Sequence, residues 1–285
     1  MIRRAAVAGR WYPGTADVLR SEVDRHLGGA TREVAGDLVA LVAPHAGLMY
    51  SGPVAAHAYT LLRGRPFDLV VLVGPSHFVG FDGVAVFPGE GFASPLGIAP
   101  VDEDAAAALV RTAPVVHADA APHGREHSLE MQLPFVQRLA PDTPILPLLM
   151  GYQTGETARA LADGLTRVLQ GRRTLLVASS DLSHYHDART AAALDAIVIE
   201  HVRRFDPDGL QRALDVRPEH ACGGGPMVAV MRAARALGAC DALALHYADS
   251  GDVSGDKGAV VGYLAAAFGN FRERGHSLGK DDDQH

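Results

Sequence analysis

Short apolar runs rich in Val, Leu and Ala alternate along this chain with longer segments of helical period. Each run ends abruptly in polar, Gly or Pro residues, which is typical of buried strands. The segments between them, such as the one with Leu161, Leu165 and Val168, repeat apolar residues as amphipathic helices do. This alternation predicts an α/β fold with a mostly parallel central sheet flanked by helices. The predicted strands are Leu38–Ala43, Phe67–Val73, Ile145–Leu149, Thr174–Ala178, Ala242–His246 and Ala259–Ala266.

We expect one domain over residues 1–270. A chain of 285 residues can bury a substantial core, and no linker-like Ser/Pro run, repeat or low-complexity tract divides this part. Residues 271–285, which end in Lys-Asp-Asp-Asp-Gln-His, are predicted to be a disordered tail because they are too polar to join a core. The segment Gly83–Gly97, with Val84 and Val86 before Pro/Gly turns, predicts an added hairpin at a sheet edge.

Charge and composition exclude several classes of protein. A net charge of -7 and a pI near 6.0 leave no basic face for a phosphate backbone, so we expect no nucleic acid partner. No stretch approaches the ~18 apolar residues of a membrane span. Two cysteines are too few for a disulfide framework, and the apolar start is broken at Arg10, so we expect a cytoplasmic protein.

Polar residues capable of chemistry follow several predicted strands. His45 and His77 each come a few residues after a strand, as do Asp181 with His184, and then Asp252. The carboxyl ends of strands line the ligand crevice in open parallel sheets. These side chains are therefore predicted to converge in one cleft.

The residue types in this cleft point to a metal site. Two neutral imidazoles with one carboxylate or thiolate, and with open positions, form the ligand set of non-haem iron, and zinc or copper accept similar sets. His45 and His77 are the first candidates for ligands. A single strand-end histidine is more often a hydrogen-bonding residue, and Asp181 has a second interpretation as a helix cap.

A second polar cluster, residues 123–130, contains His127 and Glu130. Ser128 is a candidate helix cap, and Pro134 close behind predicts a short or kinked helix. His127 and Glu130 are interpreted either as a proton carrier and its partner over the cleft or as a surface capping motif.

Cys222 precedes three glycines that open a predicted helix, where a lowered thiol pKa or an anion cradle is physically possible. The glycine spacing matches neither the dinucleotide fingerprint nor the P-loop, so no nucleotide cofactor is predicted. The chain also lacks the Gly-x-Ser-x-Gly elbow of serine hydrolases.

Five motifs together resemble the Memo family, in that family's order and from about residue 2 to residue 268. The bacterial and archaeal members are called AmmeMemoRadiSam system protein B. The motifs are Ala8-Gly9-Arg10-Trp11-Tyr12-Pro13, Ala43-Pro44-His45-Ala46-Gly47 with Tyr50-Ser51-Gly52, Gly74-Pro75-Ser76-His77, Glu126-His127-Ser128-Leu129-Glu130 with Leu133-Pro134-Phe135, and Ser179-Ser180-Asp181-Leu182-Ser183-His184.

The resemblance implies a fold similar to the class III extradiol dioxygenases, LigB-like enzymes that open catechol rings with non-haem iron. It implies that His45 and His77 are metal ligands and that Asp181 and His184 lie in the cleft. It also implies partners, an AMMECR-type protein and a radical SAM enzyme, and a third ligand near the end of the chain.

The identity of that third ligand is open. Memo proteins have a cysteine a few residues after a Tyr-Ala-x-Ser stretch, and the simplest register places Val253 there, which cannot ligate a metal. Asp252 supplies a carboxylate, Cys222 reaches in, or two histidines hold the metal alone. We favour Asp252.

The function predicted from the resemblance is that of a metal-binding protein, with Fe(II) first and copper or zinc as alternatives. It acts as a dioxygenase-like oxidoreductase on a small molecule or on a partner's modified residue. His184, His127 and Glu130 handle protons while Asp181 orients an imidazole. The alternative is a binding or scaffold protein that uses the same cleft for a peptide or partner.

Overall fold

Four parallel strands form the centre of the sheet in the computed structural model, which describes residues 1–30 and 34–272. Their order is β2 (Ala35–Ala43), β9 (Thr174–Ser179), β3 (Leu69–Pro75) and β8 (Ile145–Met150). The side chains of β3, β8 and β9 are buried throughout, because helices cover both faces. The predicted α/β fold with a parallel centre is confirmed.

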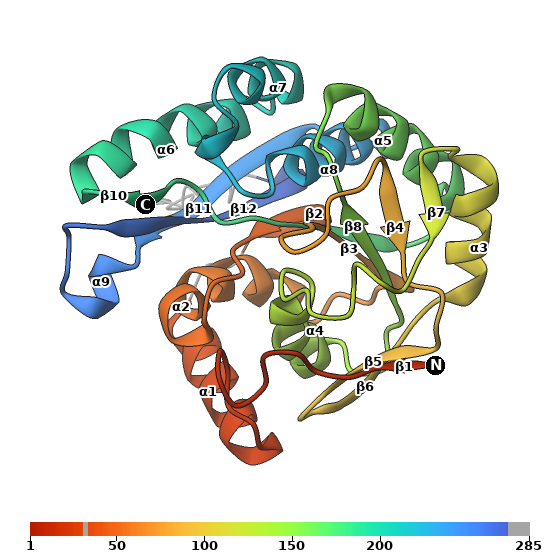
Figure 1. Cartoon of the computed structure of the whole chain (residues 1–285), viewed down its shortest axis with the longest axis horizontal. Coiled ribbons are helices and arrows are strands. Elements are labelled where there is room, and N and C mark those ends of the chain that lie inside the picture. Colours follow the sequence, from red (N-terminus) through yellow and green to blue (C-terminus); the bar gives the residue numbers. More distant parts are fainter. Residues whose placement is uncertain (31–33, 273–285) are drawn as a thin grey trace, which may run out of the picture.

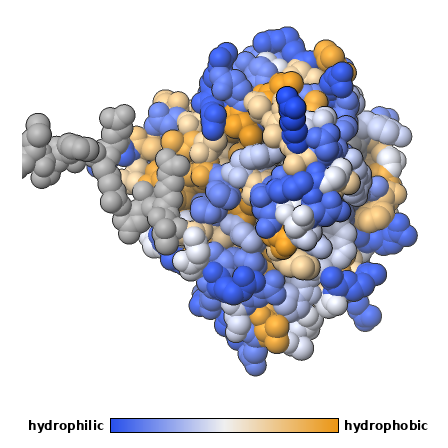
Figure 2. Space-filling view, turned by 90° about the vertical axis from the view of Figure 1, so that its left-hand side faces the viewer, coloured by the Kyte–Doolittle hydropathy of each residue, from blue (hydrophilic) through white to orange (hydrophobic). Residues whose placement is uncertain are grey.

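Both flanks of the sheet depart from parallel order (Figure 1). On one side, β12 (Val260–Arg272) runs antiparallel to β2, and β11 (Asp241–Asp249) and β10 (His184–His186) pair antiparallel with β12. On the other, β4 (Val84–Val86) is antiparallel to β8 and parallel to β7 (Val116–Ala118). Figure 2 faces the side where β10 to β12 lie in Figure 1, and apolar and polar side chains are interspersed on it.

The predicted hairpin is displaced along the chain. β4, at the start of the predicted segment, joins the main sheet as a single strand. The hairpin instead consists of β5 (Gly91–Ser94) and β6 (Gly97–Pro100), because a two-residue turn follows Ser94 and Gly97 takes a positive φ of 120°. With β1 (Ile2–Arg3) it forms a separate small sheet.

The helices form one layer on each face of the sheet (Figure 1). Along β3, Leu69 and Val71 face one hydrophobic core while Val70 and Leu72 face the other, as the period of a strand requires. One layer holds α3 (Glu103–Thr112), α5 (Gly155–Leu169), α6 (Ala188–Arg203), α7 (Pro207–Val216) and α8 (Gly224–Ala236), and the other α1 (Ala16–Gly29), α2 (Leu48–Tyr59) and α4 (Leu133–Leu139). The short helical turns are η1 (Thr60–Leu62), η2 (Glu130–Gln132), η3 (Pro218–His220) and α9 (Gly251–Ser254).

Within residues 1–30 and 34–272, no helix has both the length and the apolar character needed to cross a membrane. The predicted disordered tail, apart from its first two residues, lies outside the described residues.

Candidate functional site

The loops that leave three central strands meet at one end of the sheet. In the parallel register Ala43 lies opposite Ser179, so the loops that carry His45 and Asp181 start side by side. β3 pairs with β9 and ends at Pro75, shortly before His77. The predicted convergence takes place for these three loops, and it brings the His45 and His77 rings to a centroid distance of 5.2 Å.

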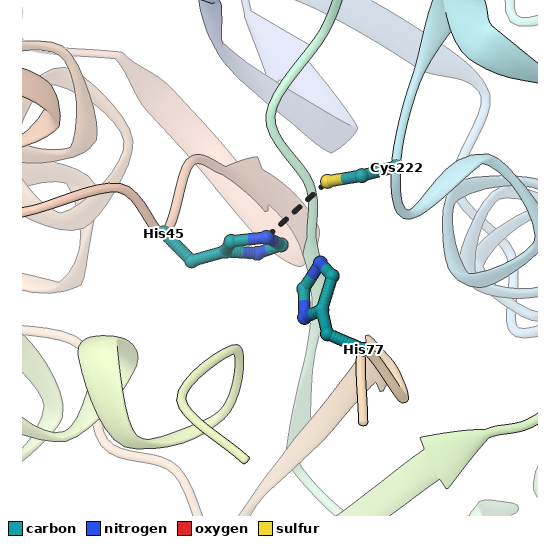
Figure 3. Close-up of side chains that lie close together, drawn as sticks. All are labelled: His45, His77 and Cys222. Atoms are coloured by element: carbon teal, nitrogen blue, oxygen red, sulfur yellow. Dashed lines mark hydrogen bonds between the residues drawn. The ribbon is translucent and has the colours of Figure 1, made fainter. Parts of the chain in front are cut away.

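Cys222 completes a group of three ligand atoms with these histidines. Its Sγ lies 3.2 Å from His45 Nε2, and one ligand atom each from His45, His77 and Cys222 lie within 4.8 Å of one another (Figure 3). The cysteine arrives from the loop before α8. A Cβ on Gly223 would lie 2.3 Å from the backbone oxygen of Ser179, so only glycine allows this loop to approach β9.

The hydrogen bonds around Ser179 fix the His45 imidazole. The Ser179 hydroxyl donates to the Ser128 carbonyl (2.7 Å) and accepts from the Gln132 amide (2.7 Å). Its single proton is thus used, so toward His45 Nδ1, 2.9 Å away, it can only accept. His45 Nδ1 therefore carries the proton, and the lone pair on Nε2 faces Cys222.

Glu126 fixes the His77 imidazole in the same way. Its carboxylate accepts from His77 Nδ1 (2.9 Å) and from the His77 backbone N–H (2.6 Å). Nδ1 is therefore protonated, and in the neutral imidazole the lone pair is on Nε2. Burial opposes the charge on Glu126, but the hydrogen bonds from His77 and Ser128 prevail and lower its pKa to about 2.

Glu126 itself is occupied as an acceptor. The backbone N–H groups of His127 and Ser128 also donate to Oε1, each at 2.8 Å. Glu126, His77 and His127 have ligand atoms within 4.8 Å of one another, but the carboxylate is committed to these donors. This second group therefore orients His77 and is a poor cation site.

Asp181 holds the backbone of the His45 loop. Its Oδ1 accepts from the N–H groups of His45 (2.7 Å) and Ala46 (3.3 Å), whereas its own N–H donates to Cys222 Sγ (3.3 Å). Burial raises the pKa of Asp181 to about 7 despite these bonds. Asp181 was expected to orient an imidazole directly. It instead holds the backbone of the loop that carries the His45 imidazole.

The Cys222 thiol is held in a protonated form by its surroundings. Burial and the nearby Asp181 carboxylate raise the pKa of the thiol, while burial lowers the pKa of His45. The thiol therefore does not transfer its proton to the imidazole, and the contact between Sγ and His45 Nε2 is a hydrogen bond between two neutral groups. A cation bound between them would take the place of this thiol proton.

His127 lies over the group of ligand atoms. Its ring stacks on His77 at a centroid distance of 4.6 Å and contacts Trp11 at 4.3 Å. Burial lowers the pKa of His127 to about 4, so the ring is neutral near pH 7. This position suits the predicted proton carrier.

Glu130 is fully buried and does not face the cleft. Its two oxygens accept from the Arg3 guanidinium, the Tyr12 hydroxyl (2.6 Å), and the N–H groups of Ala6 (2.8 Å) and Val7 (3.0 Å). Every one of these partners belongs to the N-terminal segment. Glu130 therefore anchors the segment that carries Trp11 to the site, and the structure assigns it no contact suited to proton transfer.

Asp252 lies apart from the two histidines and is not in their group of ligand atoms. Its carboxylate binds Lys257 Nζ (2.6 Å) and accepts from the Asp249 N–H (3.0 Å). It is half-exposed on α9, which folds back on Lys257, and that ion pair lowers the pKa of Asp252. Of the three alternatives for a third ligand, the geometry favours Cys222.

His184 stands at the margin of the site. It begins β10, opposite Val261, and burial lowers its pKa. The next residue, Tyr185, has a positive φ of 63° and a side chain that is 77% exposed. A non-glycine residue in this conformation is uncommon, and such strain concentrates near functional sites.

The main residues missed by sequence reasoning are Glu126, Ser179 and Gln132. Glu126 and Gln132 do not follow a strand, and Ser179 ends one but acts through its hydrogen bonds to His45 and Gln132. The Glu126-His127 pair is the only sequence signal that could have pointed to the first of them.

These features define a single-domain α/β protein with an imidazole and thiol cluster at the carboxyl end of its parallel strands. A family model described as Memo-like protein matches residues 3–267. A MEMO1 family protein of Methanosarcina mazei is 41% identical over 268 residues, 93% of this chain and 98% of that protein. A MEMO1 family protein of Nitrosopumilus maritimus is 35% identical over 275 residues, which are 94% of this chain and 100% of that protein. The chain belongs to the Memo family.

A solved structure supports the fold independently. The uncharacterized protein JW3007 from Escherichia coli K12 has a TM-score of 0.53 and 18% identity, with coverage of 80% of this chain and 99% of that one. Likeness at this identity bears on the fold alone.

Proposed function

We propose that this Memo-family protein binds one transition-metal ion through His45, His77 and Cys222. The observation that carries the proposal is the pair of hydrogen bonds to Ser179 and Glu126, which engage both Nδ1 atoms and leave both Nε2 atoms as donors to a metal beside a thiol. Two neutral imidazoles and a cysteine are ligands of iron, copper and zinc. The donor set therefore fits the metal that the family resemblance implies.

The thiol ligand adds a preference for copper and zinc among these metals. Thiolate is a soft ligand that suits copper and zinc, and imidazoles suit iron as well. We propose Fe(II) or copper for a dioxygenase-like oxidoreductase, with zinc as the alternative. When bound, such a metal would supply a Lewis acid and one-electron chemistry.

The protein's own residues would orient ligands and move protons. Ser179 and Glu126 fix the two imidazoles, and such supporting contacts govern both ligand orientation and metal affinity. His127 is neutral near pH 7 and accepts a proton from a group bound above His77, while Trp11 covers its ring. His184 offers a second proton acceptor at the margin.

Metal content tests this proposal. Protein purified anaerobically and loaded with Fe(II), Cu or Zn should retain about one equivalent after dialysis, by elemental analysis. His45→Ala, His77→Ala and Cys222→Ser should each lose it. Asp252→Asn is the matched control and should retain metal, because Asp252 pairs with Lys257. Full retention by Cys222→Ser together with loss in Asp252→Asn would refute the ligand set.

A second candidate function is a binding or scaffold role for the same cleft. Three exposed aromatic rings favour it: Trp11 and Phe78 contact His127, and Tyr185 contacts His184. Exposed aromatic side chains are enriched where proteins bind peptides or partners. Protein that retains none of the three metals after anaerobic loading would favour this role.

A further inference from the structure

A cavity of about 280 Å³ adjoins Cys222 on the side formed by α7, α8 and the segment after β8. Gly151, Tyr152 and Gln153 follow β8 directly, so the cavity opens at the same end of the sheet as the proposed metal site. Its lining also includes Gln211 and Asp215 of α7. A small molecule bound there would lie beside Cys222.

The described part of the cavity wall carries one charged group, the carboxylate of Asp215. Asp215 is exposed, and its carboxylate accepts from the Gln211 amide at 2.8 Å. Gln211 is only 9% exposed, and its Oε1 has no partner among the described residues. Tyr152 adds an aromatic ring that is 59% exposed. Among the described residues that line the cavity, none is Lys, Arg or His.

The backbone N–H groups at the start of α8 are not available to bind an anion. The N–H of Gly225 donates to Gln153 Oε1 (2.8 Å) and that of Gly223 to the Ser180 hydroxyl (2.9 Å). The N–H of Gly224 donates to the Ala221 carbonyl (3.2 Å). The donors that could hold an anion at a helix N-terminus are thus engaged within the protein.

We propose that this cavity binds a protonated primary amine of a small molecule. An ammonium group donates three hydrogen bonds and is attracted by the Asp215 carboxylate and by the face of an aromatic ring such as Tyr152. The Gln211 amide already donates to the Asp215 carboxylate and holds it at the cavity wall. An anion would meet a carboxylate and no cation.

The inference that this amine belongs to a substrate of the metal site rests on the proposed function, whereas the cavity's preference for amines does not. The two are separated by testing amine binding on protein stripped of metal with EDTA. Loss of metal binding would then leave the amine result standing, and failure of amine binding would leave the metal proposal untouched.

The probes are n-pentylamine, 1-pentanol and pentanoate, which share a chain and differ in charge. Titrations near pH 7 are followed by amide shifts in ¹H–¹⁵N NMR spectra of the full chain. Pentylammonium should shift the signals of Tyr152, Gln153 and Gly225, and the other two probes should not. Asp215→Asn should weaken binding about two- to fivefold, because it keeps the shape and an acceptor but loses the charge.

Asp208→Asn is the matched control, since it removes the same charge from the same helix, where Asp208 pairs with Arg232. It should leave pentylammonium binding unchanged. Equal binding of the three probes, absence of shifts at the cavity, or equal effects of Asp215→Asn and Asp208→Asn would overturn the proposal.

Discussion

Glu130→Gln is expected to destabilise the protein strongly. The substitution keeps the shape of the side chain but turns one acceptor oxygen into an NH₂ group. If the amide nitrogen takes the Oε1 position, the Val7 N–H and the Tyr12 hydroxyl lose their acceptor. If it takes the Oε2 position, the Ala6 N–H and the Arg3 guanidinium do. In either orientation buried Arg3 loses its countercharge.

Removing one partner of a buried ion pair costs about 3–5 kcal/mol. The free energy of unfolding in urea should fall by about this amount in Glu130→Gln. Trp11 is the sole tryptophan of the chain and lies in the anchored segment, so its emission should shift to the red and acrylamide should quench it more. Asp24→Asn is the control: it breaks a half-exposed pair with Arg138 and should cost at most about 1 kcal/mol. Equal stability of the two variants, with unchanged Trp11 fluorescence, would refute the anchoring role.

Three further predictions concern the site and its surroundings. Glu126→Gln should weaken metal affinity about 10- to 100-fold in a chelator competition, with partial recovery in Glu126→Asp, because the carboxylate orients His77; unchanged affinity would contradict this. Gly223→Ala should lower both thermal stability and metal content, because the new Cβ meets the Ser179 oxygen at 2.3 Å and displaces Cys222; an intact site would argue against that close approach. Burial lowers the pKa of His123 to about 4 from an ordinary 6.5, so the unfolded chain binds its proton first on acidification, and stability is lost as the pH falls from about 6.5 to 4. This amounts to ~2 kcal/mol between pH 7 and pH 5, and urea unfolding at the two pH values should show a smaller loss in His123→Phe; an equal loss would exclude His123 as a source.

The sequence was sufficient to predict the fold and the convergence of three strand-end loops. The apolar runs of the central strands are visible without tertiary information, because strands buried on both faces need apolar side chains throughout. Parallel order then forces their carboxyl ends together, which brings His45, His77 and Asp181 to the same end of the sheet. The position of the β5–β6 hairpin was harder to predict, because it depends on the local turn between Ser94 and Gly97.

The roles of individual polar residues could not be predicted from position alone. Asp252 follows a strand as the ligand candidates do, but Lys257 five residues later forms an ion pair with it. Glu130 has the residue type of a proton carrier, but it is buried and accepts hydrogen bonds from four groups of the N-terminal segment, so its role is structural. Cys222 comes from a loop before a helix, and the glycine at 223 was the local signal of its close approach.

The most direct test of the central claim is X-ray absorption spectroscopy at the metal edge of the loaded full-length protein. The account predicts one sulfur scatterer at ~2.3 Å and two imidazoles in the zinc-loaded protein. Nitrogen and oxygen ligands alone in the wild-type protein would contradict the assignment of Cys222 as a ligand.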